Sequence, residues 1–262
     1  MTDFIKDNVN VEVELDEYGH VPIAIQDQHT DIVDLQLCNK IADIELSTQP
    51  DIDQNVVSLV AGHGVVAGNV ICFKSGIHFY QGIAIAVSTN DITLDSPLDF
   101  SFPVGSEAFR SVSNMAVNGS VTPVIFKVSP PASTKWDLCR VIITMTDDLA
   151  MDDGKFGGIS AISKGVVIRK KNASYKNIFN AKTNGDFRSR SFDVQYLDAT
   201  LGPGGLYGFG CRRSFNGFDK NGVVIRLDGD TADEFQFIIQ DDLTGLSSLR
   251  ACIQGHVVSG ES

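Results

Sequence analysis

Two acid-rich turns contain the residues of this chain best suited to binding a ligand. The stretches "TDDLAMDDGKFGG" and "LDGDTADEF" each bring several carboxylates together, and calcium prefers such hard oxygen ligands. Their acids are Asp147, Asp148, Asp152 and Asp153 in the first turn, and Asp228, Asp230, Asp233 and Glu234 in the second. Neither turn has the glycine and glutamate spacing of an EF-hand loop, and aspartate is common in turns that bind no metal. We therefore assign no metal ligands and leave calcium at either turn open as the alternative.

The other residues that perform chemistry form no recognisable catalytic pattern. His63 lies between glycines in "AGHGVVAG", where we expect it to shape a turn. Glycoside hydrolysis needs two carboxylates that face each other, and the sequence does not show such a pair. Asp95 and Asp99 are therefore candidates only in the sense that any acid is. The glycine-rich stretch Leu201–Arg213 lacks the Lys-Ser/Thr of a phosphate-binding loop. We predict no catalytic residues, no cofactor and no enzymatic activity.

The five cysteines are Cys38, Cys72, Cys139, Cys211 and Cys252, and they are scattered singly. No CxxC or Cys/His pair is present, so the sequence does not indicate structural zinc. Most of them lie in apolar, strand-like runs such as "NVICF" and "LRACIQ". We expect buried, reduced thiols.

Charge is segregated along the chain, whose net charge is −12. The first 53 residues hold 13 acids and only 2 bases, whereas the segment 164–190 holds 8 bases against the single acid Asp186. In an assembly of many copies, one subunit's acidic segment could lie on its neighbour's basic strip. The alternative is that the two segments are solvated and never meet. Arg212, Arg213 and the strip could contact nucleic acid, but the negative net charge argues against it.

The elements that position these residues are predicted to be strands. "VNVEVEL" near the N-terminus alternates apolar and polar residues, and "VVSLV", "NVICF" and "HFYQGIAIAV" are short runs separated by Gly or Asn turns. A short helix over residues 39–46 is the one weak helical signal. Long helical periodicity is absent, so the expected class is all-β: a small β-barrel or sandwich module, then a larger, jelly-roll-like β-sandwich, with an extended N-terminal segment.

The turn, loop and proline signals of the sequence predict three domains. Residues 1–54 are expected to form an acidic N-terminal arm or hairpin segment, residues 55–131 a small β module, and residues 132–262 a β-sandwich. Pro130-Pro131 marks the second boundary, because neither proline can donate to a central ladder. Within 55–131, Asn118-Gly119 predicts a hairpin turn.

The pentapeptide "GVVIR" occurs twice, at Gly165–Arg169 and Gly222–Arg226. Each copy is followed by a polar turn, a second strand-like run and a glycine-containing turn, at Asn184-Gly185 and Thr244-Gly245. We interpret the copies as equivalent strand–turn–strand units, with chance similarity between two strands as the alternative.

The N-terminus, "MTDFIKDNVNVEVE", has no basic region followed by an apolar stretch, so no signal peptide is expected. Apolar runs such as Ile83–Val87 are far too short to span a membrane. We expect synthesis in a cytoplasm and no membrane insertion.

One part of the chain resembles a known group of proteins. The stretch "GHGVVAGNVICFKSGIHFYQGIAIAVSTNDITLDSPLDFSFPVGSEA" looks like a β module of virion proteins from tailed bacteriophages, in which "GH-G-x-x-x-G-x-x-I" opens a strand pair and "ITLDSPLD" closes it. The C-terminal "NGVVIRLDG…FQFIIQDDLTGLSSLRACIQGHVV" is similar to segments of the same group. The resemblance covers roughly residues 60–110 and 160–258. It implies a structural subunit of the tail, baseplate or head–tail region, with no catalytic residues to carry over.

The favoured hypothesis is therefore a virion protein, assembled in the host cytoplasm, whose partners are other copies of itself and other virion proteins. The alternative is a carbohydrate- or receptor-binding β-sandwich, either a module of a phage tail or a free lectin-like protein, that recognises a glycan such as one on the host surface. Its candidate contact residues are Tyr80, Tyr207, Phe215 and Phe218. A glycan-cleaving enzyme on a β scaffold is the third hypothesis.

Overall fold

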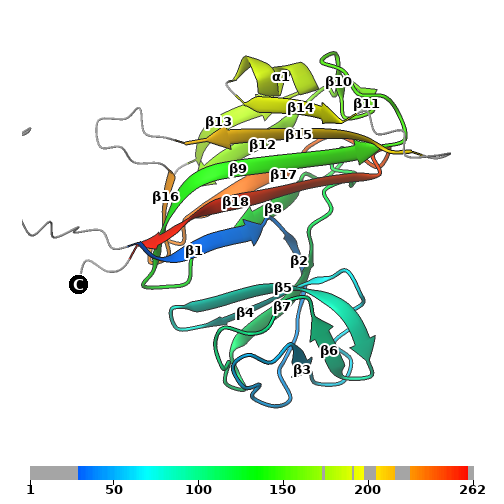
Figure 1. The fold of residues 1–262 in the computed structure, drawn as a ribbon. Helices are drawn as coiled ribbons and strands as arrows, with labels where there is room; N and C mark the ends of the chain where they lie inside the picture. The colour runs from blue at the N-terminus through cyan, green and yellow to red at the C-terminus, as the bar shows by residue number, and fades with distance from the viewer. Residues whose placement is uncertain (1–28, 173–174, 191, 198–204, 216–224, 259–262) are drawn as a thin grey trace, which may run out of the picture.

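The computed structural model describes residues 29–172, 175–190, 192–197, 205–215 and 225–258. Over these ranges the regular secondary structure consists almost entirely of antiparallel strands, which form a larger sandwich and a smaller module (Figure 1). The predicted all-β class is confirmed. No helix in the described ranges is long and apolar enough to cross a membrane.

The first sheet of the sandwich is built around the long strand β9. In spatial order its strands are β1 (His29–Gln36), β18 (Ser248–Val258), β9 (Lys135–Asp147), β15 (Tyr207–Ser214) and β14 (Asp193–Leu197), and β16 (Ile225–Asp228) also pairs with β9. Val141, Ile143 and Met145 are buried, and the residues between them are more exposed, because successive side chains of a strand point to opposite faces.

The second sheet of the sandwich packs over that buried face. Its order is β13 (Tyr175–Ala181), β12 (Val166–Lys171), β17 (Glu234–Ile239) and β8 (Val124–Val128). Ile168, Phe237 and Phe126 from this sheet share one hydrophobic core with the buried residues of β9. The larger body is therefore the predicted β-sandwich.

The smaller module is one antiparallel sheet. Its order is β2 (Asn39–Asp43), β7 (Glu107–Val112), β4 (Val70–Ser75), β5 (His78–Ser88), β6 (Asp91–Leu94) and β3 (Val56–Ser58). Phe73 and Phe102 are fully buried in its own core. β2 and β3 do not pair with each other, and beyond their ends Leu46 and Leu59 form only an isolated bridge, so the sheet does not close and the alternative of a barrel is wrong.

Strand pairing divides the chain differently from the predicted boundaries at residues 54 and 131. β1 belongs to the sandwich and β2 to the small module, so the described part of the expected arm is shared between the two bodies. β8, expected in the small module, pairs with β17 of the sandwich. The small module is thus inserted between β1 and β8. Pro130-Pro131 lies where the chain passes from β8 to β9, that is, from one sheet of the sandwich to the other. The predicted arm up to residue 28 lies outside the described residues.

The described helix α1 (Asn184–Ser189) stands where the sequence indicated a glycine turn. The Thr183 side chain accepts a hydrogen bond from the Asp186 N–H, and the Asp186 carboxylate accepts the Thr183 N–H at 3.0 Å, which forms a capping box. Phe187 of the helix is fully buried and its ring lies 5.3 Å from that of Phe179. The helix covers the side of the sandwich between the edge strands β13 and β14, beside the short pair β10 (Lys155–Phe156) and β11 (Ile159–Ser160).

Two further predictions about local structure differ from the fold. The segment 39–43 is strand β2 and not a helix. Asn118 forms an isolated bridge with Asp242, not a hairpin turn.

The two "GVVIR" copies are not structural equivalents. The first forms β12, which pairs with the next strand, β13, in one sheet. The described residues of the second, Ile225 and Arg226, begin β16 in the opposite sheet, and the following strand, β17, lies across the core from it. Chance similarity between two strands is the better interpretation.

Candidate functional site

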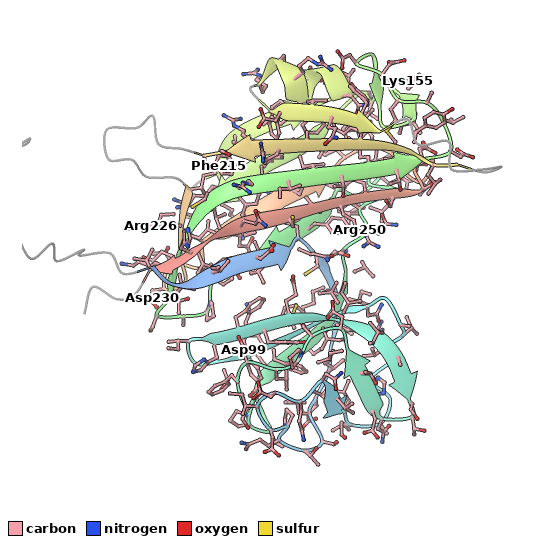
Figure 2. The ribbon with its side chains drawn as sticks, in the orientation of Figure 1. Asp99, Lys155, Phe215, Arg226, Asp230 and Arg250 are labelled. Atoms are coloured by element: carbon pink, nitrogen blue, oxygen red, sulfur yellow. The ribbon has the colours of Figure 1, made fainter. Side chains whose placement is uncertain are left out.

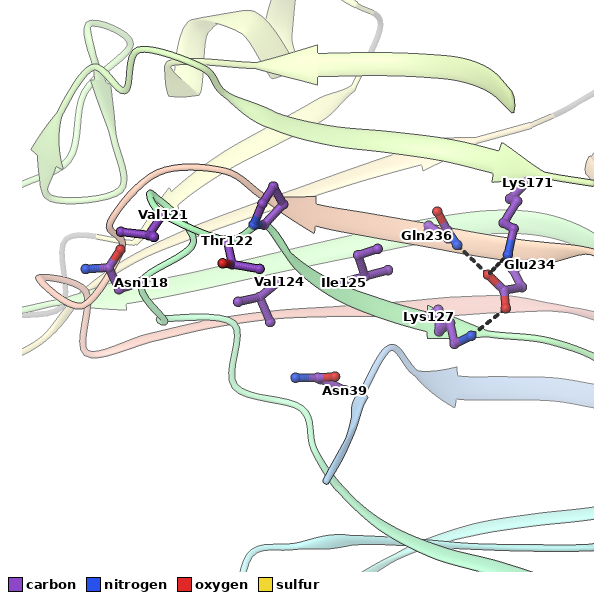
Figure 3. A pocket seen from close by; sticks show the side chains of 11 residues that line it. Asn39, Asn118, Val121, Thr122, Val124, Ile125, Lys127, Lys171, Glu234 and Gln236 are labelled. Atoms are coloured by element: carbon purple, nitrogen blue, oxygen red, sulfur yellow. Dashed lines mark hydrogen bonds and ion pairs between the residues drawn. The ribbon is translucent and has the colours of Figure 1, made fainter. Parts of the chain in front are cut away.

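A groove of about 660 Å³ runs along β8 at the side of the sandwich nearest the small module (Figure 3). Its lining combines the outer edge of β8, the loop before it and polar side chains from the neighbouring strands. The lining residues are Asn39, Asn118, Val121, Thr122, Pro123, Val124, Ile125, Lys127, Lys171, Glu234 and Gln236.

The outer edge of β8 is open at Ile125. β8 is the last strand of its sheet, and on its free side the Lys127 N–H donates to the Cys38 carbonyl at 2.9 Å. Backbone groups alternate sides along an antiparallel strand, so those of Ile125 also point away from β17. No hydrogen bond from another described residue meets them. The groove therefore exposes a short stretch of unpaired strand, next to Val121, whose side chain is 92% exposed.

A buried carboxylate forms the polar end of the groove (Figure 3). Glu234 is 9% exposed, and its oxygens lie 2.5 Å from the Lys127 ammonium and 3.5 Å from that of Lys171. The Gln236 amide also donates to it. Burial acts to raise the pKa of Glu234, but the lysines and Gln236 outweigh it and hold that pKa below its ordinary value.

The remaining acids of "LDGDTADEF" are also bound by groups of the same chain. The Lys170 ammonium lies 2.6 Å from Asp233 and the Lys135 ammonium 3.8 Å from Asp228. Asp230 accepts the Ser133 N–H at 2.7 Å. Over the described ranges, no three His, Cys, Asp or Glu side chains are grouped so that they could hold a metal ion.

The other acid-rich turn contains an unusual carboxylate. Asp147 is 1% exposed; one of its oxygens accepts the Asp148 N–H at 2.7 Å, and the other has no partner among the described residues. Burial raises the pKa of Asp147. Asp153 accepts from the Tyr196 hydroxyl, and its carboxylate lies 3.3 Å from Arg188.

Most described cations of the basic strip have partners within the chain. Lys170 and Lys171 pair with Asp233 and Glu234, and the Lys164 ammonium donates to the Ser120 carbonyl at 2.6 Å. Two cations of the basic strip and two acids of the acid-rich turn thus neutralise each other inside one sandwich. This finding weakens the hypothesis that the strip receives a neighbour's acidic segment.

His63 shapes a turn, as the sequence indicated. Its Nε2 bonds the Thr89 carbonyl at 3.0 Å and its Nδ1 accepts the Val65 N–H at 3.0 Å. Asp95 accepts the Ile83 N–H at 2.7 Å. These bonds give both side chains a structural role in the small module.

The three described aromatic residues considered for glycan binding do not form one exposed surface. Tyr80 is 6% exposed and donates to the Ser96 carbonyl at 2.6 Å. Phe215 is half-buried against the ring of Phe235, at 6.3 Å between centroids. Tyr207 is half-buried in β15, and Phe218 lies outside the described residues.

Sequence reasoning missed the groove because it placed β8 in the wrong body. The alternation in "VIFKV" identifies a strand but not its neighbour, and Lys127 and Glu234 are 107 positions apart.

No family model, curated protein or solved structure matches this chain.

Proposed function

We propose that this chain is a structural subunit of a tailed-phage particle, in the tail, baseplate or head–tail region, and that it works by protein–protein assembly and not by catalysis. The phage assignment rests on the resemblance of roughly residues 60–110 and 160–258 to virion β modules. The assembly mode rests on one observation, the open edge of β8 beside its groove.

An open edge is a template for another strand. A strand from a neighbouring subunit would receive backbone hydrogen bonds from Ile125, while side chains on either side of it would enter the groove. Val121 and Val124 give the groove an apolar wall that such a strand would cover. The edge is short, and Lys127 is already bonded to Cys38, so the docked strand would be short as well.

The sharpest test replaces Ile125 with proline. The only backbone hydrogen-bonding group that proline removes is the outward N–H, because the ladder bonds to β17 come from the flanking residues. Val124 already has the extended conformation that a residue before proline requires. Ile125→Val is the matched control, since it keeps the N–H and a β-branched side chain. Oligomeric state is measured by native mass spectrometry at low and moderate salt.

We expect the unmodified chain and Ile125→Val to form the same closed oligomer and Ile125→Pro to remain monomeric with an unchanged far-UV circular dichroism spectrum. The oligomer should persist at moderate salt, because strand pairing involves no exposed ion pair that salt could screen. A Pro variant that assembles as well as the control would remove β8 from the interface. A strict monomer for all three chains would reject self-assembly.

A further inference from the structure

Cys38 and Cys72 meet in a cleft of about 310 Å³ between the small module and the sandwich. Cys38 lies on the link between β1 and β2, and Cys72 lies in the middle of β4. They are 5% and 0% exposed and share a small cluster with Val70. Both cysteines line the cleft, so a small solute that enters the cleft would lie next to them.

One side chain links the two sulfurs. The Gln81 amide nitrogen lies 3.7 Å from Cys38 Sγ and 3.9 Å from Cys72 Sγ, so one amide group contacts both sulfurs. The neighbouring Cys72 thiol holds the pKa of Cys38 below its usual value, against the effect of burial and with help from Ser111 and Lys74. Burial raises the pKa of Cys72. The two thiols therefore differ in reactivity, since the thiolate is the nucleophile.

We propose that Cys38 and Cys72 are a redox-sensitive pair that a hydroperoxide converts to a disulfide across the junction of the two modules. The Cys38 thiolate attacks the peroxide, the O–O bond breaks, and a sulfenic acid and one water result. The Cys72 sulfur then attacks the sulfenic sulfur and a second water leaves. Two thiols and one hydrogen peroxide give one disulfide and two waters, with the two electrons passing from sulfur to peroxide.

The other cysteines are poorly placed for this reaction. Cys211 is 2% exposed in the sandwich core. Cys139 and Cys252 lie on the paired strands β9 and β18, but Cys252 is opposite Ile142, three residues from Cys139, so their Cα atoms are about 10 Å apart. A disulfide needs a Cα separation below about 7 Å.

The disulfide would tie the link residue Cys38, which bonds β8 of the sandwich, to the central strand β4 of the small module. Closing this loop restricts the unfolded chain and should raise the melting temperature by roughly 5–10 °C. The inference does not depend on the proposed function.

The test treats the reduced, folded full chain with stoichiometric hydrogen peroxide. We expect the intact mass to fall by two hydrogens, non-reducing peptide mapping to join Cys38 to Cys72, and the melting temperature to rise. Cys72→Ser should stop at a Cys38 sulfenic acid that dimedone traps, and Cys38→Ser should form no disulfide. Cys252→Ser is the matched control and should close like the unmodified chain.

Three results would each overturn the proposal: a disulfide that forms only after the chain is unfolded in urea, a cross-link joining any other pair, or a Cys72→Ser variant whose dimedone adduct lies elsewhere than Cys38.

Discussion

The side chain of Gln81 bonds both backbone groups of Gln36 on the edge of β1. Its Oε1 accepts the Gln36 N–H at 2.7 Å, and its Nε2 donates to the Gln36 carbonyl at 3.0 Å. A single carboxamide from β5 of the small module thus occupies the position of a neighbouring strand on a sandwich edge. Nearby, the ring of Phe79 lies 5.7 Å from that of Trp136 across the same junction. The two bodies are therefore joined by specific contacts as well as by the chain.

Replacing Gln81 with leucine should weaken this junction. The substitution keeps the bulk but leaves the Gln36 N–H and carbonyl without their partner, and we expect the free energy of unfolding to fall by about 1–3 kcal/mol. Urea denaturation monitored by circular dichroism measures the change. Gln195→Leu, at an exposed position of β14, is the control and should stay within about 0.5 kcal/mol of the unmodified chain. Equal losses for both variants would show that the carboxamide bridge contributes nothing.

Glycine at position 229 is required by a close approach of the backbone. A Cβ there would lie 1.7 Å from the Pro131 carbonyl oxygen, and the Gly229 N–H bonds the Thr134 carbonyl at 2.9 Å. We expect Gly229→Ala to cost about 3 kcal/mol, because the turn after β16 must shift away from the β8–β9 crossing. The urea midpoint is the readout. Gly210→Ala is the control, since no atom lies within 4 Å of its added Cβ, and it should change stability by less than about 1 kcal/mol.

Stability should fall in acid because of the paired carboxylates Asp233 and Glu234. The pKa of each is lower in the folded chain than its ordinary value of 3.8 or 4.5, despite burial, because Lys170 and Lys127 bind the ionised forms. Their contribution is therefore present above the unfolded pKa and is lost as pH falls through the folded pKa. Urea unfolding from neutral pH down to about pH 3 should show the loss. Glu234→Gln should flatten this acid dependence; an unchanged slope would mean that the Lys127 pair does not couple to folding.

Helix α1 should depend on its N-terminal cap. Thr183→Ala removes the hydroxyl that accepts the Asp186 N–H, and we expect a loss of about 1 kcal/mol. Ser189→Ala, at the exposed last residue of the helix, should change stability by less than about 0.5 kcal/mol. Thermal unfolding of both variants provides the comparison, and similar melting temperatures would exclude the cap as a stabilising feature.

Strand positions were more predictable from the sequence than strand neighbours. The short runs "VVSLV", "NVICF" and "HFYQGIAIAV" correctly mark β3, β4 and β5, because the residue preferences of a strand are a local property. Pairing is set by contacts between distant residues, so β8 was placed beside the wrong strands although its own residues read as a strand. Helix α1 was missed because Asn184-Gly185 favours a turn, and only the Thr183–Asp186 cap argues otherwise.

The candidate site was even harder to predict from the sequence than the strand neighbours. The sequence groups Glu234 with three other acids in a turn that resembles a calcium-binding loop. In the structure its carboxylate contacts two lysines, Lys127 on β8 and Lys171 on β12. The acid-rich and base-rich segments can be recognised from the sequence. That they lie side by side within one chain depends on how β17 pairs with β8 and β12, which the sequence does not show. Local composition therefore indicates which residues carry charge, and topology decides which of them neutralise each other.

The insertion of the small module between β1 and β8 has a mechanical consequence. The chain enters the module through the link at Cys38 and leaves it after β7, so two covalent connections join it to the sandwich (Figures 1 and 2). A body held by one linker can swivel, whereas a body held at two points resists torsion. A force applied to the module would reach β1 and β8, which lie in opposite sheets, and would therefore be shared between both layers of the sandwich.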